Sequence, residues 1–136
     1  MTIRFAEQAD AIHIIRAIQN KRMDYNTTAD VKNDIALGRL LVAVDGDKRL
    51  GSLAIVYKPH RGYYALMRGC VYSKQSKGKG VMTALIKYAI SLNLGDLGGT
   101  PWNTNPAIIH IFQKCGFQYQ YTFNKFYDFY KKSLDK

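Results

Sequence analysis

The chain has 136 residues, a length that suits one domain with a buried core, and its 47% hydrophobic and 12% aromatic residues exclude a disordered class. No stretch approaches the roughly 20 apolar residues that a membrane-spanning helix needs. The net charge of +10 is large for this length and favours polyanionic partners, although many small basic domains are merely soluble in this way.

The cysteines and the N-terminus indicate a cytoplasmic protein. Cys70 and Cys115 lie in apolar runs, without the spacing of a metal site or a redox pair, so we expect two reduced core thiols and no metal. The first residues lack the charged and then apolar pattern of a secretion signal. We therefore expect a cytoplasmic chain that does not enter a membrane.

The N-terminal residues predict a strand and a helix pair. Thr2–Phe5 alternates as a short strand does, and residues 7–20 carry apolar side chains at helical spacing. Thr27 or Thr28 caps a second helix, which ends at Gly38. Five aspartates are expected on helix surfaces or on a distal hairpin: Asp10, Asp30, Asp34, Asp45 and Asp47.

The middle of the chain predicts three strands. Residues 40–44 and 50–57 flank Asp45-Gly46-Asp47-Lys48, where Asp-Gly supplies the positive backbone angles of a tight hairpin. The next strand, Tyr63–Tyr72, is apolar on both faces apart from Arg68. A strand that is buried on both faces is a central one.

The last third alternates helices and strands. We expect a helix over 81–92, a strand over 97–100, and a helix that starts at Pro106 and ends before Gly116. Residues 117–123 and 126–130 then form a closing hairpin. Periodicity thus predicts the order β-α-α-β-β-β-α-β-α-β-β, an α/β (α+β) fold in a single domain of residues 1–136.

The segment Gln75–Met82 lies between the central strand and the helix that follows it. A chain that turns through glycines into a helix presents backbone N–H groups at the helix N-terminus, where the helix dipole favours a negative charge. Gly78 and Gly80 allow close approach to a ligand, and Lys74, Lys77 and Lys79 add positive charge. The segment predicts a phosphate cradle, although an isolated Gly-x-Gly is more often a surface turn.

A second segment, Asn105–Phe117, begins with an asparagine. Phe112 follows seven residues later and starts the pattern aromatic-x-Lys-x-Gly-Phe, which ends at Phe117. Together the two segments resemble the GCN5-related N-acetyltransferase (GNAT) family over nearly the whole chain. The family's Gln/Arg-x-x-Gly-x-Gly/Ala loop fits residues 75–80 by its letters, and residues 77–82 by the strand before and the helix after. We prefer the second register, which places Met82 where the family usually has Gly or Ala.

The resemblance implies a central, mostly antiparallel sheet of about six to seven strands, flanked by about four helices, and acetyl-CoA as cofactor. In the family, two central strands splay apart and the pantetheine arm lies between them like an added strand. The implied cofactor-binding residues are Cys70, Val71 and Tyr72 along that arm, Lys77, Gly78, Lys79, Gly80, Val81, Met82 and Thr83 at the pyrophosphate, and Asn105 and Phe112 on the later helix. Asn105 fits an N-cap equally well.

The catalytic acid and base are not identifiable from the sequence. The family's tyrosine proton donor corresponds to Phe112, which cannot donate, and its usual glutamates correspond to positions near Leu66 and at Thr100. Backbone N–H groups near Val71 and Tyr72 are candidates to polarise the thioester carbonyl. Deprotonation through water, or an amine that is already neutral, remains open.

The leading hypothesis is an acetyl-CoA-dependent N-acetyltransferase. The alternative is a GNAT-fold protein without catalysis that binds a partner or nucleic acid through its basic surface. The charge balance favours an amine on an acidic macromolecule, such as a nucleic-acid-associated protein or an aminoacylated RNA. A monomer and a homodimer both remain open.

Overall fold

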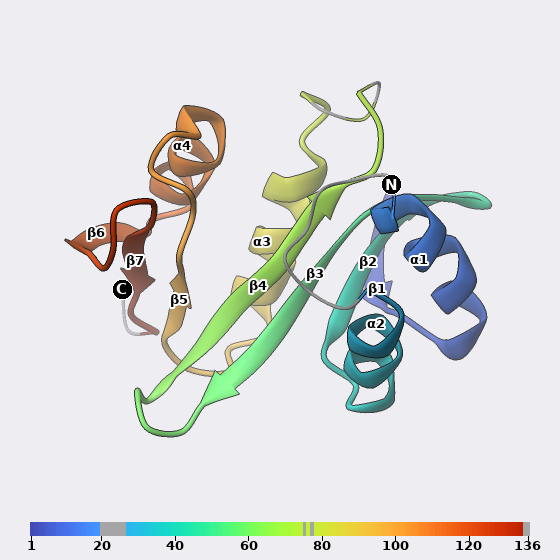
Figure 1. Ribbon diagram of the computed structural model, residues 1–136, viewed down its shortest axis with the longest axis horizontal. Coiled ribbons are helices and arrows are strands. Elements are labelled where there is room, and N and C mark those ends of the chain that lie inside the picture. The colour runs from blue at the N-terminus through green and yellow to red at the C-terminus, as the bar shows by residue number, and fades with distance from the viewer. Residues whose placement is uncertain (20–26, 75, 77, 135–136) are drawn as a thin grey trace. The chain divides into compact units, whose positions relative to one another are not determined.

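The computed structural model of the chain describes residues 1–19, 27–74, 76 and 78–134. In chain order its elements are β1 (Thr2–Phe5), a 3-10 helix (Gln8–Asp10), α1 (Ala11–Gln19), α2 (Thr27–Ala36), β2 (Leu40–Asp45), β3 (Lys48–Lys58), β4 (Tyr63–Val71), α3 (Val81–Ser91), β5 (Leu97–Gly99), α4 (Pro106–Lys114), β6 (Gln118–Thr122) and β7 (Asp128–Lys132) (Figure 1).

The seven strands form one sheet in the order β1-β2-β3-β4-β5-β7-β6. The β1/β2, β2/β3, β5/β7 and β6/β7 pairs are antiparallel, whereas β4 and β5 are parallel. The predicted order of elements and the predicted α/β fold with a mostly antiparallel sheet are confirmed. None of the helices in the described part of the chain is long and apolar enough to span a membrane.

The chain divides into two compact units. The first unit comprises Met1–Ala54 and Arg68–Leu85, and the second comprises Ile55–Met67 and Ile86–Lys136. Strands β3 and β4 therefore contribute residues to both units. The single domain of residues 1–136 stays a prediction.

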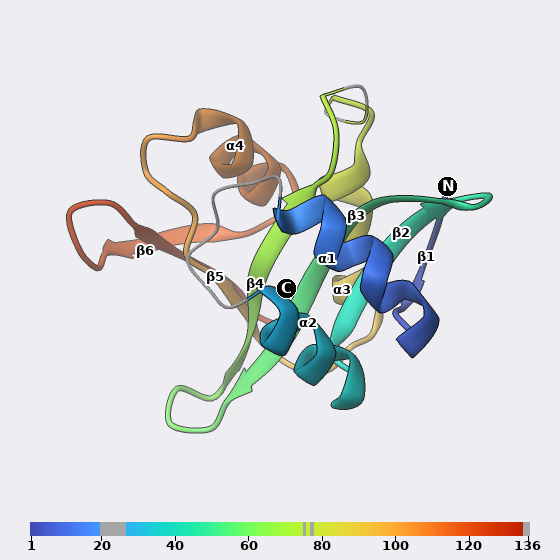
Figure 2. The same ribbon diagram turned by 45° about the vertical axis from the view of Figure 1, so that its right-hand side comes forward.

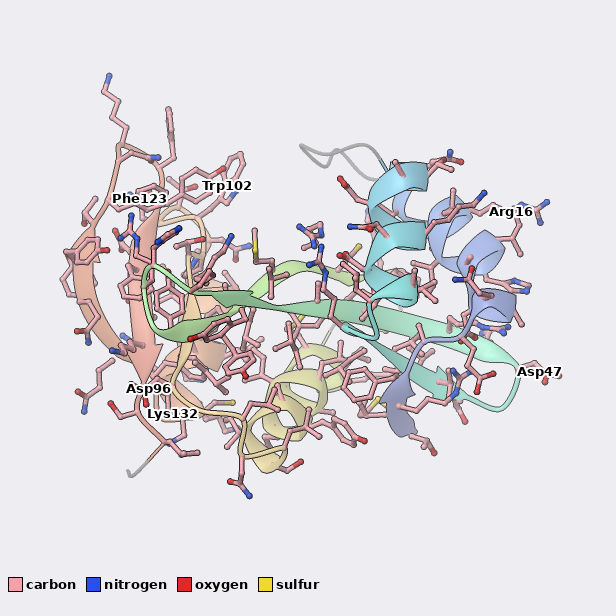
Figure 3. The ribbon with its side chains drawn as sticks, turned by 90° about the horizontal axis from the view of Figure 1, so that it is seen from below. Arg16, Asp47, Asp96, Trp102, Phe123 and Lys132 are labelled. Carbon is pink, nitrogen blue, oxygen red and sulfur yellow. The ribbon has the colours of Figure 1, made fainter. Side chains whose placement is uncertain are left out.

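The core of the first unit lies between its strands and the helices on either face. Ile14 and Ile18 of α1 and Leu41 and Val42 of β2 are almost fully buried. Figure 2 shows α1 and α2 in front of β2 and β3. Figure 3 shows the first turns of α3 on the opposite face of these strands. Apolar spacing in the sequence thus identified the buried helix face correctly.

Two of the aspartates expected on helix surfaces are buried instead, with 1% of Asp10 and 2% of Asp34 exposed. Asp10 accepts hydrogen bonds from Arg4 at 2.7 and 2.9 Å and from Arg49 at 3.0 Å. The bonds from Arg4, together with the N–H of Glu7 and the Arg49 guanidinium, hold the pKa of the Asp10 carboxyl well below its usual range. The expectation was wrong because buried charges are retained where cations can pair with them.

The second unit carries β5, α4 and the hairpin of β6 and β7. The parallel pairing of β4 with β5 joins Tyr64–Leu66 to Leu97–Gly99. The last strand begins at Asp128, two residues later than we predicted, because the backbone of Phe126 is used in the turn. The N–H of Phe126 donates to the Asn124 side chain, and the carbonyl of Phe126 accepts from the N–H of Asn103.

Candidate functional site

The end of β4 carries the residues that we expected along the pantetheine arm. Cys70 is buried, and Val71 and Tyr72 are half-buried. The N–H of Tyr72 donates to the carbonyl of Leu50 at 3.0 Å, so it is not available to polarise a substrate carbonyl. That part of the prediction was wrong. Because successive N–H groups of a strand point to opposite sides, the Val71 amide faces away from Leu50 and stays a candidate.

The loop between β4 and α3 is built on short polar contacts. The N–H of Ser76 donates to Ser73, whose hydroxyl lies 3.0 Å from that of Ser76, and the N–H of Lys79 donates to the Ser76 carbonyl at 3.3 Å. Gly78 and Gly80 have φ angles of +81° and +77°, a region that residues with a side chain rarely occupy. Both glycines are therefore needed for this path of the backbone.

The first turn of α3 supplies backbone donors. The first helical hydrogen bond runs from Ala84 N–H to the carbonyl of Gly80 at 2.9 Å. The N–H groups of Val81, Met82 and Thr83 precede it and have no acceptor within the helix. Nothing lies within 4 Å of the place where a Cβ of Gly80 would stand. These amides and this open approach suit a pyrophosphate.

Met82, the departure from the family pattern, turns its side chain towards the sheet. A Cβ built on Gly69 of β4 would lie 3.0 Å from the Met82 Cε. The side chain therefore packs over Gly69, and the Met82 backbone amide is the group that remains for a phosphate. Lys77, which we predicted to contact the cofactor, lies outside the described residues.

In the second unit, Asn105 is the N-cap of α4. Its side-chain oxygen accepts from Ile108 N–H at 3.3 Å, and Pro106 follows as the first helical residue. The N-cap interpretation is therefore confirmed. The cap uses the side-chain oxygen, and the amide nitrogen of this exposed residue is a donor that the cap does not need. Contact with the cofactor stays a prediction.

Phe112 is a core residue of the second unit, with 5% of its surface exposed. Its ring lies 4.9 Å from that of Phe117 and 6.2 Å from that of Tyr130. A Cβ on Gly99 would stand only 2.5 Å from the Phe112 Cζ. The ring therefore fills the space above Gly99, and its predicted contact with the cofactor stays a prediction.

The positions where the family has acidic residues hold no proton acceptor. Leu66 is buried in β4, and Thr100 is an exposed residue after β5. Desolvation raises the pKa of the half-buried Cys115 thiol, against the opposing effect of nearby lysines, so this thiol is protonated at neutral pH. Among the described residues, no group of three or more His, Cys, Asp or Glu side chains could hold a metal ion.

Sequence reasoning missed the partner of Arg68, the one charge in the central strand. Arg68 donates to Asp34 at 2.7 and 2.9 Å, and Arg39 donates to the same carboxylate at 2.7 Å. Arg68 also has a φ of +53°, which is uncommon outside glycine. An isolated charge in an apolar strand signals that a buried partner exists, but the sequence does not identify it.

The comparisons with known proteins agree with this geometry. The model of the acetyltransferase (GNAT) family matches residues 9–117. A GNAT-family acetyltransferase from Bacillus cereus superposes with a TM-score of 0.84 at 15% identity, covering 97% of this chain and 96% of that one. A Salmonella typhimurium protein described as an acetyltransferase, solved with its cofactor acetyl-CoA, gives 0.74 at 21%, covering 99% and 94%. A comparison with curated proteins gave no match.

A third solved structure, a mutant spermidine/spermine N-acetyltransferase from Vibrio cholerae, has a TM-score of 0.76 at 16% identity, covering 98% of this chain and 94% of that one. At these identities the three structures establish the fold alone. The assignment to a family rests on the match of the family model, which covers well over half of the chain.

Proposed function

Because the chain belongs to the acetyltransferase (GNAT) family, whose acetyl donor is acetyl-CoA, we propose that it is an N-acetyltransferase that transfers the acetyl group to an amine. The observation that carries the proposal is the glycine loop that ends in the first-turn amides of α3. We assign the pyrophosphate to the amides from Gly78 to Thr83, with Lys77 and Lys79 supplying positive charge.

The cofactor supplies an activated thioester, and the chain supplies binding and orientation. Bound acetyl-CoA would supply a C–S bond that breaks as the C–N bond to the amine forms, and the proton of the amine would pass through water to the sulfur, so that the products are an amide and the coenzyme A thiol. We assign the pantetheine arm to Cys70, Val71 and Tyr72, with the Val71 amide as the donor to the carbonyl oxygen. Asn105 and Phe112 complete the proposed set of contacts.

We propose that water takes the proton of the amine, or that the amine is neutral before it binds, so that no general base from the chain is needed. Leu66 cannot accept a proton and Phe112 cannot donate one. A lysine-type amine has a pKa of about 10.4, so an enzyme without a base turns over faster as the pH rises. With a lysine-type acceptor, a pH profile of acetyl transfer that increases without a plateau between neutral and alkaline pH supports this arrangement.

The acceptor that we propose is an amine on an acidic macromolecule, a nucleic-acid-associated protein or an aminoacylated RNA. The net charge of +10 supports this, because a basic surface attracts polyanions. We also propose a cytoplasmic location. Efficient acetylation of spermidine or kanamycin, with no activity towards polyanionic acceptors at low salt, would contradict the proposed acceptor.

Calorimetric titration with acetyl-CoA tests the cofactor site, and release of the coenzyme A thiol across a panel of amines tests the transfer. Gly80→Glu adds a negative charge where we place the pyrophosphate, so we expect it to abolish acetyl-CoA binding in a folded protein. If this variant binds acetyl-CoA at unchanged affinity, the assigned site is wrong.

A second candidate is a protein that binds a partner without catalysis, which the residues at Leu66, Thr100 and Phe112 favour. It predicts that no amine in the panel releases coenzyme A thiol, even where acetyl-CoA binds.

A further inference from the structure

The second unit presents a row of aromatic side chains on one face of its strands. We call it the aromatic face, and it consists of Tyr63, Trp102, Tyr121, Phe123, Tyr127 and Phe129. The rings contact one another in pairs: Tyr63 with Phe129 at 5.2 Å, Tyr121 with Phe129 at 5.2 Å, Phe123 with Tyr127 at 5.7 Å, and Trp102 with Tyr127 at 5.7 Å.

A glycine of β5 lets the rings of Tyr63 and Phe129 meet. A Cβ built on Gly98 would lie 2.7 Å from the Tyr63 ring and 2.9 Å from that of Phe129. Any larger residue at Gly98 would separate the rings of β4 and β7, which meet across β5. The next residue, Gly99, faces Phe112 on the other side of the sheet. The aromatic face is therefore opposite to the face that α4 covers.

An irregularity in β6 adds Tyr121 to the row. Tyr119 pairs with Tyr130 and Tyr121 pairs with Phe129, with a register shift between them. Residues two apart in a regular strand share a face, but this shift places Tyr119 and Tyr121 on opposite faces. Tyr119 contacts the ring of Tyr130 at 5.9 Å, whereas Tyr121 joins the aromatic face.

The outer rings are exposed and their backbone is held in place. Trp102 and Phe123 are each 52% exposed, and Figure 3 shows both at the same end of the second unit. Phe123 N–H donates to the Tyr127 carbonyl, and an isolated bridge pairs Trp102 with Tyr127. A contiguous exposed apolar patch of this kind marks an interaction site more often than an isolated exposed ring does.

The charges beside the row are positive. Lys125 is exposed in the turn between β6 and β7, and Arg61 is exposed in the turn before β4. Arg61 precedes Tyr63 by two residues, so its backbone lies at the end of the row. The acidic residue of the hairpin, Asp128, accepts a hydrogen bond from the Thr122 hydroxyl. Because Asp128 and Tyr130 are two residues apart in β7, both side chains lie on the face opposite to the aromatic face.

We propose that the aromatic face binds single-stranded RNA, with bases stacked on the exposed rings and phosphates beside Lys125 and Arg61. Successive bases stacking on aromatic side chains in a basic groove is the common mode for single strands, and tyrosine hydroxyls can bond the 2′-hydroxyl. A second copy of the chain fits less well, because two molecules of net charge +10 repel one another. The inference makes the proposed class of acceptor more specific. The binding of RNA does not require acetyl transfer, and only the role that we give to this binding rests on the proposed function.

The test uses a fluorescein-labelled single-stranded RNA of about 12 nucleotides, within the usual ~4–16 per binding fold. Trp102 is the only tryptophan of the chain, so its emission reports on the face directly while anisotropy reports on the RNA. We expect RNA to quench Trp102, and DNA of the same sequence and an RNA duplex to bind more weakly. The binding assay contains no acetyl-CoA.

The matched variants lie on the two faces of β6. We expect Tyr121→Ala and Phe123→Ala each to weaken RNA binding about 5- to 150-fold, the range for loss of one stacked base. Tyr119→Ala removes an equally exposed ring, 52%, from the opposite face and leaves the affinity unchanged. Lys125→Gln reduces the slope of log affinity against log salt by about 0.7.

Several results would overturn the inference. The first group concerns RNA itself: no change in Trp102 emission or in anisotropy, an equal loss of RNA affinity in Tyr119→Ala, or tighter binding of DNA or of the RNA duplex. The second group concerns other partners: a Trp102 response to anionic lipid vesicles but not to RNA, or a self-association that Phe123→Ala abolishes. Transfer of acetyl to a small amine is measured separately. If transfer is present and RNA binding is absent, this inference fails while the proposed function stands.

Discussion

The assignment of the phosphate cradle predicts that a single methyl group at Gly80 weakens cofactor binding, whereas the same change at Gly46 does not. Gly80 has a φ of +77° and Gly46, in the β2–β3 hairpin, has +59°. At both glycines, no atom lies within 4 Å of the position that an added Cβ would take, so the two alanine variants introduce backbone strain without a steric clash. Gly46→Ala is therefore a matched control for Gly80→Ala.

The expected loss of folding stability is similar in the two variants. An L-residue in the left-handed region costs roughly 1–2 kcal/mol, and the stiffer unfolded chain offsets about 0.4–1 kcal/mol of this. Each variant should therefore lose about 1 kcal/mol, a decrease of about 2–8 °C in melting temperature for a domain of this size. Strain alone does not distinguish the two sites.

Acetyl-CoA distinguishes them. If relief of strain at Gly80 turns one amide away from the pyrophosphate, a hydrogen bond to a charged group is lost, worth about 1.5–3 kcal/mol, so the affinity falls about 10- to 150-fold. At a ligand concentration of about 100 times the wild-type dissociation constant, the wild type and Gly46→Ala gain about 2.7 kcal/mol, and Gly80→Ala gains only about 0.3–1.4 kcal/mol.

Thermal unfolding of the three proteins with and without acetyl-CoA measures this difference. A full gain in Gly80→Ala would show that the loop does not hold the pyrophosphate. An equal reduction in Gly46→Ala would show that the loss of affinity does not come from the Gly80 amides, which would refute the local reasoning.

Three further changes test the interior of the first unit. Ser52→Ala should raise the free energy of unfolding by about 1 kcal/mol in denaturant titrations, because the fully buried Ser52 hydroxyl has no hydrogen-bond partner among the described residues; a decrease would indicate an unseen partner. Asp34→Asn should lower it by about 3–5 kcal/mol, because Arg68 loses its buried counter-charge; a loss below 1 kcal/mol contradicts the burial. The lowered pKa of Asp10 stabilises the fold above the unfolded-state pKa of about 3.9, so stability should fall as the pH decreases below about 4, and less in Asp10→Asn than in the wild type.

The order of the elements was predictable from sequence because each signal is local. Hydrophobic spacing identified the helices, and Asn105-Pro106 located the start of α4. The paired motifs of residues 77–82 and 105–117 then indicated the family, which the family model confirms. Such signals need only neighbours along the chain, so tertiary structure has little opportunity to override them.

Features that depend on distant partners were not predictable. The register shift in β6 that separates Tyr119 from Tyr121 leaves no mark in the sequence, since both residues simply alternate with glutamine. The short strand over 97–100 was predicted, but not that its glycines, Gly98 and Gly99, each leave room for rings on one face of the sheet. Some glycines are needed because a neighbouring side chain fills the space of a Cβ, and others because the backbone has a positive φ. The sequence alone does not distinguish these two reasons.

The buried aspartates also change what the charge balance implies about the acceptor. Of the ten acidic residues, Asp10 and Asp34 are each held by two arginines, and Asp96 lies 3.4 Å from Lys131. A carboxylate that is already paired contributes little to binding a cation, because a polyamine would have to displace an arginine that is closer and partly desolvated. The carboxylates left to recognise a cationic acceptor are therefore fewer than the sequence suggests, while the exposed lysines of the second unit, such as Lys125, keep their full attraction for a polyanion.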